Sequence, residues 1–209
     1  DGELLWSNLN YNSTSNDMSP ITYVEEGQGD CGTWSDMIVI GWSDGTIQAL
    51  HPVTGNLFWQ QNTEVLTWGI TGSLLIDSDD LLVPTRTGLA NYCLSDGSIN
   101  FEIETGLGWR NGVSKSGENY FLGDETGTLW KVSKQGNISS KFLDIGKIRH
   151  APLPVGGKLL VHGQGATEST IALLDPTEFT LEILSKSGPS PGLPIILKGA
   201  SLTRYSHFV

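Results

Sequence analysis

The sequence has 209 residues and a formal net charge of −11, from 12 Lys and Arg against 23 Asp and Glu. An acidic surface of this kind repels phosphate backbones, so nucleic acid is excluded as an expected partner. Hydrophobic residues make up 38% of the chain, which is enough to bury a core. No apolar run approaches the roughly 18 residues that a membrane-spanning helix needs. The composition therefore predicts a folded acidic protein without a membrane span.

The chain begins with a pattern that returns later. Gly2–Trp6 repeats the order of residue types found in Gly55–Trp59, which is a Gly, a polar residue, two apolar residues and a Trp. Gly55–Trp59 is predicted to be the turn and outer strand of a repeated unit. Gly2–Trp6 is therefore expected to be an outer strand whose own unit is absent upstream. The polar stretch from Trp6 to Pro20 is predicted to be a long loop.

Four repeated units follow. Their equivalent points, Gly45, Gly88, Gly127 and Ser169, succeed one another at intervals of 43, 39 and 42 residues. Periods of this length occur in β-propellers and in helical HEAT or armadillo arrays. Each unit contains short β-rich runs broken by Gly turns, and none contains a long amphipathic stretch. The period therefore favours propeller blades over helical repeats.

The second unit shows how four strands are expected to fit into one repeat. The predicted strands are Leu74–Ile76, Leu81–Pro84, Leu89–Leu94 and Ser98–Ile103. Gly88 and Gly97 lie in the turns between them, where a Gly is expected to supply a positive φ. Apolar residues run consecutively through the middle strands, as in strands that are covered on both faces.

The sequence therefore predicts an all-β fold, a β-propeller of four-stranded blades of about 40 residues each. Residues 1–209 are expected to form a single propeller domain or a propeller fragment. The predicted repeats are 21–64, 65–106, 107–146 and 147–187, and residues 1–6 and 193–209 are expected to form a partial blade. The terminal strands either meet and close a ring, or the chain is part of a larger ring. The second arrangement is favoured, because the fifth unit lacks one strand.

Cys31 and Cys93 are the two cysteines of the chain. They can pair in an oxidising compartment, but the sequence does not test the geometry that a disulfide needs. Cys93 lies in an apolar strand pattern, which favours a buried thiol.

The segment Asp44–Trp59 resembles the repeat of the PQQ-like (quinoprotein dehydrogenase-like) β-propellers. That repeat has Asp-Gly, an apolar strand, Ala-Leu, Thr-Gly and a second apolar strand ending in Trp. The fourth unit keeps Ala172–Thr177 and has Glu178 in place of the turn Gly. The resemblance implies the fold, and it implies that Trp6 and Trp59 pack between neighbouring blades. Because the family contains dehydrogenases, scaffold lipoproteins of outer-membrane assembly and secreted binding proteins, it does not select a function.

Few residues are arranged for catalysis or metal binding. The four His show no metal-ligand spacing, and two cysteines 62 residues apart form no zinc motif. The adjacent cysteines expected of a quinone-dependent dehydrogenase are also absent. The acidic turns Asp77–Asp80 and Gly123–Gly127 offer oxygens to Ca²⁺, but Asp in hairpin turns commonly makes local hydrogen bonds. We expect no catalytic residue and no cofactor, and the metal question stays open.

One positional signal indicates a binding site. Trp68, Trp109 and His150 precede the markers of the next repeat by 20, 18 and 19 residues, and Arg110 and Arg149 lie beside them. Equivalent positions in neighbouring blades form a ring, so these side chains are expected to cluster at one rim of the channel. Aromatic and Arg residues are common in binding hot spots. The alternative is that the Trp rings fill gaps between blades.

The predicted function is therefore binding rather than catalysis. The first hypothesis is a non-enzymatic secreted or envelope propeller that binds or scaffolds a protein or glycan, in an extracellular, cell-envelope or periplasmic location. The second is a portion of a quinone-dependent dehydrogenase. The third is a structural array within a larger surface protein or assembly.

Overall fold

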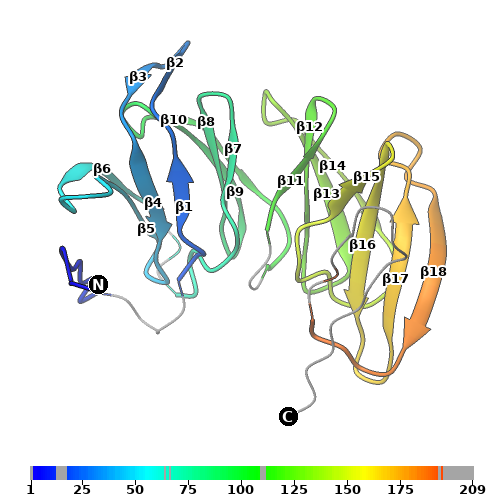
Figure 1. Cartoon of the computed structure of the whole chain (residues 1–209). Helices are drawn as coiled ribbons and strands as arrows, with labels where there is room; N and C mark the ends of the chain where they lie inside the picture. The colour runs from blue at the N-terminus through cyan, green and yellow to red at the C-terminus, as the bar shows by residue number, and fades with distance from the viewer. Residues whose placement is uncertain are drawn as a thin grey trace. The chain divides into compact units, whose positions relative to one another are not determined.

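The computed structural model describes residues 2–12, 18–63, 65, 67–108, 112–192 and 194. All regular secondary structure in these residues is β-strand. The chain divides into two compact units, Asp1–Val113 and Ser114–Val209, and each is described by itself. Each unit contains two four-stranded antiparallel sheets, here called blades 1 to 4 in chain order (Figure 1). The predicted all-β fold of four-stranded units is confirmed.

Unit 1 contains blades 1 and 2 and one additional hairpin. Blade 1 has the strand order β1-β4-β5-β6, and blade 2 has its strands in sequence order from β7 to β10. The hairpin β2–β3 is inserted between β1 and β4 and forms a separate two-stranded sheet. The strand bounds are β1 Thr22–Val24, β2 Gly27–Gly29, β3 Gly32–Trp34, β4 Met37–Gly41, β5 Thr46–Leu50, β6 Leu57–Asn62, β7 Leu75–Asp77, β8 Asp80–Pro84, β9 Gly88–Cys93 and β10 Ile99–Glu104.

Unit 2 contains blades 3 and 4, each with its strands in sequence order. The bounds are β11 Ser114–Ser116, β12 Asn119–Gly123, β13 Thr128–Ser133, β14 Ile138–Phe142, β15 Leu153–Val155, β16 Lys158–Gln164, β17 Ser169–Leu174 and β18 Leu181–Ser187. The predicted partial blade at residues 193–209 lies outside the described residues apart from Pro194. Its pairing with residues 1–6 stays a prediction.

The core of each unit lies between its two blades. Every residue of β9 is buried, and so are four of the five residues of β8. In unit 1, Val39 and Ile47 of blade 1 pack in one apolar cluster with Val83 of blade 2. In unit 2, Phe121 of blade 3 and Val161 of blade 4 belong to a second cluster. Burial on both faces explains why these strands are consecutively apolar in the sequence.

The turn before each outer strand contains a residue whose backbone has a positive φ. Gly55 and Gly97 have φ values of 70° and 72° at this point, and Phe179 has 55° in blade 4. Phe179, rather than Glu178, therefore replaces the turn Gly. The expectation for Gly88 was wrong, because its φ is not positive. A Cβ at Gly88 would lie 1.9 Å from the Ile103 carbonyl oxygen, so close backbone approach explains this Gly.

The two cysteines form a disulfide, with their Cα atoms 5.8 Å apart. The expected buried thiol at Cys93 was wrong. Cys31 lies in the turn of the β2–β3 hairpin, and Cys93 ends β9 of the next blade. The partner is not visible in the sequence pattern around Cys93, because the bond joins the inserted hairpin of blade 1 to blade 2.

Trp59 joins blade 1 to blade 2 as the resemblance implied. Its side chain is buried, its indole N–H donates to the Leu94 carbonyl at 2.9 Å, and its ring covers Gly97. Trp6 makes the equivalent contacts one blade earlier, since its indole donates to the Pro52 carbonyl at 3.0 Å and its ring covers Gly55. Residues 2–6 form no strand with the described residues, in contrast to the expected outer strand. The matched pattern of Gly2–Trp6 and Gly55–Trp59 therefore reflects a shared contact with the following blade.

No helix in the described part of the chain is long and apolar enough to cross a membrane.

Candidate binding rim

The loop that connects blade 3 to blade 4, residues 143–152, carries two of the predicted site residues and is called the rim loop. It crosses the turns at one end of the two blades. Ile148 N–H donates to the Asp124 carbonyl of blade 3, while Lys147 and Gln164 of blade 4 exchange two backbone hydrogen bonds. The Ile148 side chain lies against Gly123, where a Cβ would have no room. The loop is therefore held by both blades of unit 2.

Arg149 of the rim loop is paired with Glu125 in the β12–β13 turn. Its Nε and Nη2 donate to the two carboxylate oxygens at 2.6 and 2.7 Å, and Lys147 adds a third contact at 3.1 Å. Burial raises the pKa of Glu125, but the hydrogen bonds from Arg149 and Lys147 outweigh it, and the net pKa is lowered. A bidentate pair of this kind fixes geometry. Arg149 thus joins the rim loop to blade 3.

His150 lies beside this ion pair and interacts with blade 4. Its Nε2 is 2.9 Å from the Pro191 carbonyl and 3.1 Å from the amide nitrogen of Gln164. Its ring is parallel to the ring of buried His162, with centroids 5.7 Å apart. His150 is half-buried and faces the polypeptide that follows β18.

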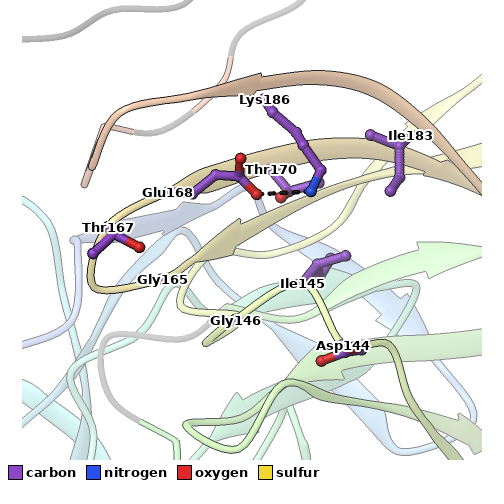
Figure 2. A pocket seen from close by; sticks show the side chains of 9 residues that line it. All are labelled: Asp144, Ile145, Gly146, Gly165, Thr167, Glu168, Thr170, Ile183 and Lys186. Atoms are coloured by element: carbon purple, nitrogen blue, oxygen red, sulfur yellow. Dashed lines mark hydrogen bonds and ion pairs between the residues drawn. The ribbon is translucent and has the colours of Figure 1, made fainter.

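A small cavity adjoins the start of the rim loop, with a volume of about 190 Å³. Figure 2 shows the ion pair of Lys186 and Glu168 on one side, with Ile145 and Ile183 also facing the space. The pair measures 2.8 Å. Small-molecule sites usually have at least about 300 Å³. This cavity is closer in size to one inserted side chain.

Unit 1 has a cavity at the corresponding place of blade 2. It is lined by Val65 of the loop after blade 1, by Thr85 and Thr87 of the β8–β9 turn, and by Glu102 to Glu104 of β10, with a volume of about 530 Å³. The two cavities therefore repeat one structural feature, a recess between a connecting loop and the outer half of the next blade. Their linings differ, since Glu168 and Lys186 line the cavity of unit 2 and Glu102 and Glu104 line the cavity of unit 1.

The predicted site residues do not occupy equivalent positions in the two connecting loops. Ile70 N–H donates to the Trp42 carbonyl and its side chain lies against Gly41, as Ile148 does at Asp124 and Gly123. Ile70 and Ile148 are therefore equivalent, and Trp68 lies two residues before this point while His150 lies two residues after it. Trp109 and Arg110 lie outside the described residues. Trp68 and His150 belong to different units, so their clustering stays a prediction.

Sequence reasoning also placed possible calcium ligands in the Gly123–Gly127 turn. Asp124 is buried and uses its carboxylate within the blade. One oxygen accepts from Thr126 and from the Thr128 N–H, and the other accepts from the Trp130 indole at 2.9 Å. These hydrogen bonds show that the Asp124 carboxylate stabilises the turn.

Repeated four-stranded blades, indole contacts between successive blades and connecting loops across their ends define a β-propeller. Solved structures support this class. BamB from Moraxella catarrhalis matches with a TM-score of 0.58 and 17% identity over 78% of this chain and 53% of that chain. The Pan2 WD40 domain of Neurospora crassa has a TM-score of 0.61 and 12% identity over 87% of this chain and 53% of that chain. The computationally designed Ika4 protein has 0.57 and 13%, covering 88% of this chain and 98% of that chain.

One curated protein is similar in sequence. It is the outer membrane protein assembly factor BamB of Legionella pneumophila (strain Paris), which is 29% identical over 171 residues, or 77% of this chain and 43% of that protein. The chain thus spans less than half the length of this relative. No protein-family profile matches the sequence.

Proposed function

We propose that this chain is part of a non-enzymatic β-propeller scaffold of the cell envelope that binds a protein partner during assembly of outer-membrane proteins. The observation that carries the proposal is the 29% identity with BamB over 171 residues. The similarity covers most of the repeats, so it concerns the blades and their connecting loops and not one local motif. The fold supports a scaffold role, because loops on a rigid framework commonly carry binding residues.

The disulfide supports the envelope location. Cys31 and Cys93 are bonded across two blades. Such bonds persist in oxidising compartments such as the periplasm and are rare in the cytosol. An envelope scaffold is therefore consistent with both the covalent structure and the BamB similarity.

We assign the partner contact to the rim, with Trp68, Arg149 and His150 as contact or positioning residues, and with Trp109 and Arg110 as further members. The rim loop is fixed by Glu125 and by Pro191, so it offers a preordered surface. The small cavity at its start fits a protruding side chain of a protein better than a metabolite. Arg149 acts in this proposal by holding the loop.

The proposed function is tested in the bacterium that encodes the chain. Deletion of the gene should lower the amounts of folded β-barrel proteins in the outer-membrane fraction, measured by quantitative mass spectrometry and by heat-modifiable migration. Expression of the encoded protein should restore them. An unchanged outer-membrane composition after deletion would contradict the role in assembly.

A matched pair of variants tests the rim in the same cells. Lys147→Gln changes the rim loop, whereas Lys134→Gln removes another lysine of unit 2 that pairs with a Glu, Glu118, away from the loop. Lys147→Gln should restore less folded barrel protein than Lys134→Gln at equal protein levels. Equal restoration would remove the rim from the proposal while leaving the assembly role intact.

A further inference from the structure

The β2–β3 hairpin, residues 25–36, lies outside the four-stranded repeat. It continues the β1–β4 pair in the same register, from Val24↔Met37 to Gly27↔Trp34, and Figure 1 shows it extending past the ends of β1 and β4. It contributes no strand to the sheet of blade 1. The four-stranded sheet of blade 1 therefore does not require this extension.

The hairpin is nevertheless firmly attached at its tip. The disulfide joins Cys31 to Cys93, the Cys31 N–H donates to Asp79 Oδ2 at 3.0 Å, and the Ser95 hydroxyl donates to the Cys31 carbonyl at 2.6 Å. These contacts fix the tip on two turns of blade 2. Gly29 packs directly against Asp79, where a Cβ would have no room.

The base of the hairpin is also closed. The Glu26 N–H donates to Asp36 Oδ1, and the Trp34 indole donates to the Glu25 carbonyl, both at 2.8 Å. A surface hairpin that is fixed at both ends loses little conformational freedom when it binds, so less of the binding energy is spent on ordering.

The two outer edges of the hairpin have no strand beside them in the described part of the chain, because the sheet contains β2 and β3 alone. Gln28 and Thr33, which face each other across the pair, are both exposed. An open strand edge presents backbone donors and acceptors that can pair with a further strand. Addition of an extended peptide to such an edge is a common mode of recognition.

All charged residues of the hairpin are acidic. Glu25, Glu26 and Asp30 are exposed on it, Asp79 lies in the turn that receives its tip, and Asp80 begins β8 next to that turn. The first 85 residues of the chain contain 12 Asp and Glu and no Lys or Arg. Desolvation, Asp36, Glu25 and Glu26 together raise the pKa of the exposed Tyr23 phenol beside the hairpin. Complementary positive charge would speed association and select the partner.

We propose that the β2–β3 hairpin is a docking edge for an extended, Lys- or Arg-rich segment of a partner protein, which adds to it as a third strand. Backbone pairing at the open edge supplies the alignment, and the carboxylates of Glu25, Glu26 and Asp30 select basic side chains on the added strand. The site is separate from the rim loop, so it does not depend on the proposed role in outer-membrane assembly.

The direct test is fluorescence anisotropy with the purified chain. The probe is a labelled peptide about ten residues long that alternates Lys and Val, a period that puts all Lys on one face of a strand. A peptide that alternates Glu and Val is the control probe. The Lys peptide should bind, the Glu peptide should not, and the affinity should fall as NaCl rises from about 50 to about 300 mM.

Matched variants locate the binding. Glu25→Gln/Glu26→Gln/Asp30→Asn should weaken the Lys peptide about tenfold, which is about 1.4 kcal/mol, or about 0.5 kcal/mol for each of three exposed pairs. Glu3→Gln/Glu102→Gln/Glu104→Gln removes the same charge elsewhere in unit 1 and should leave binding within about twofold. Equal losses in the two triple variants would mean general attraction to an acidic protein and would overturn the site.

A second probe tests strand addition itself. A Lys–Val peptide that is N-methylated at alternate residues keeps its charge but cannot pair along one edge. It should bind at least about tenfold more weakly, as expected when several backbone hydrogen bonds are lost. Equal affinity would show that the hairpin attracts charge without adding a strand, and would overturn this part of the proposal.

Discussion

The two units join their blades with different chemistry at equivalent positions. In unit 1, the indole of Trp59 donates to the Leu94 carbonyl and its ring covers Gly97. In unit 2, the corresponding carbonyl of Pro176 accepts from Lys131 Nζ at 3.1 Å, and Phe179 takes the place of the Gly. The aromatic ring thus comes from the outer strand in one unit and from the facing turn in the other.

This difference explains why the turn residue changes. A Cβ at Gly97 would lie 2.6 Å from the Trp59 ring, so the Trp requires Gly in the facing turn. Unit 2 has no Trp at this contact, which leaves space for the Phe179 side chain. Lys131 lies 5.7 Å from the centroid of that ring, and Lys141 donates to the Phe179 carbonyl at 2.8 Å. The residues on the two sides of the contact are therefore matched in each unit.

The largest expected effect tests the Trp contact. Trp59→Ala removes a buried ring between two blades and should lower the free energy of unfolding by about 3–5 kcal/mol. Lys131→Ala, at the equivalent contact of unit 2, should cost about 1 kcal/mol, because it removes one hydrogen bond and a partly exposed cation–π contact. Urea denaturation followed by circular dichroism measures both. Similar decreases in the free energy of unfolding would show that the two contacts contribute equally to stability, and would contradict the difference between the units.

The two units also differ in a second interaction that links their two blades. Unit 1 uses the Cys31–Cys93 disulfide, whereas unit 2 uses the ion pair of Arg149 and Glu125. Cys31→Ser/Cys93→Ser should lower stability by about 2–4 kcal/mol, mainly because the unfolded chain regains freedom. A reducing agent should destabilise the wild type and leave the double variant unchanged in thermal melts. A variant as stable as the wild type would mean that Asp79 and Ser95 alone hold the hairpin.

A smaller effect is expected at the turn that the two units build differently. Gly97→Ala places a Cβ at a positive φ and against the Trp59 ring, which should cost about 1–3 kcal/mol. Phe179→Gly removes side-chain packing but relieves a positive φ, so the two changes offset each other to within about 1 kcal/mol. Thermal melts of the two variants measure the contrast. A larger loss in Phe179→Gly would indicate that the Phe ring stabilises unit 2 more than its backbone conformation costs.

The sequence contains enough local information for the blades but not for every contact between them. The consecutive apolar runs, the turn glycines and the position of Trp59 each follow from neighbouring residues, and the structure confirms the strands they predict. The disulfide was missed because it joins residues 62 apart through geometry that no local pattern encodes. The β2–β3 hairpin is local, and it was missed because its two strands are only three residues long. An insertion between β1 and β4 also lengthens the first repeat without disturbing its marker Gly45.

The rim residues show a different limit. Trp68 and His150 lie at similar distances in sequence from the repeat markers that follow them. They are not structurally equivalent, because the connecting loops differ in length. The better signal was Ile70 and Ile148, each of which packs on a Gly that ends the second strand of the preceding blade. Neither Ile stands out in the sequence, because an apolar residue before a strand is common.

The last prediction uses acidification to compare the disulfide of unit 1 with the Arg149–Glu125 ion pair of unit 2. The pKa of Glu125 is lowered from an ordinary value of 4.5, because the hydrogen bonds from Arg149 and Lys147 outweigh the effect of burial. A carboxyl with a lowered pKa in the folded state contributes stability above its unfolded pKa and loses it as the pH falls through the folded value. The contribution should therefore be complete above about pH 5.5 and decline below about pH 4.5.

Arg149→Ala should cost about 1 kcal/mol at neutral pH, in the range of a partly exposed ion pair, and should flatten the decline. Cys31→Ser/Cys93→Ser should keep the wild-type slope, because a disulfide does not titrate. Urea unfolding from pH 7 to pH 3.5 measures the three slopes. If Arg149→Ala retained the full acid-dependent loss, groups other than Glu125 would account for it, and the ion pair would not be the acid-sensitive tie of unit 2.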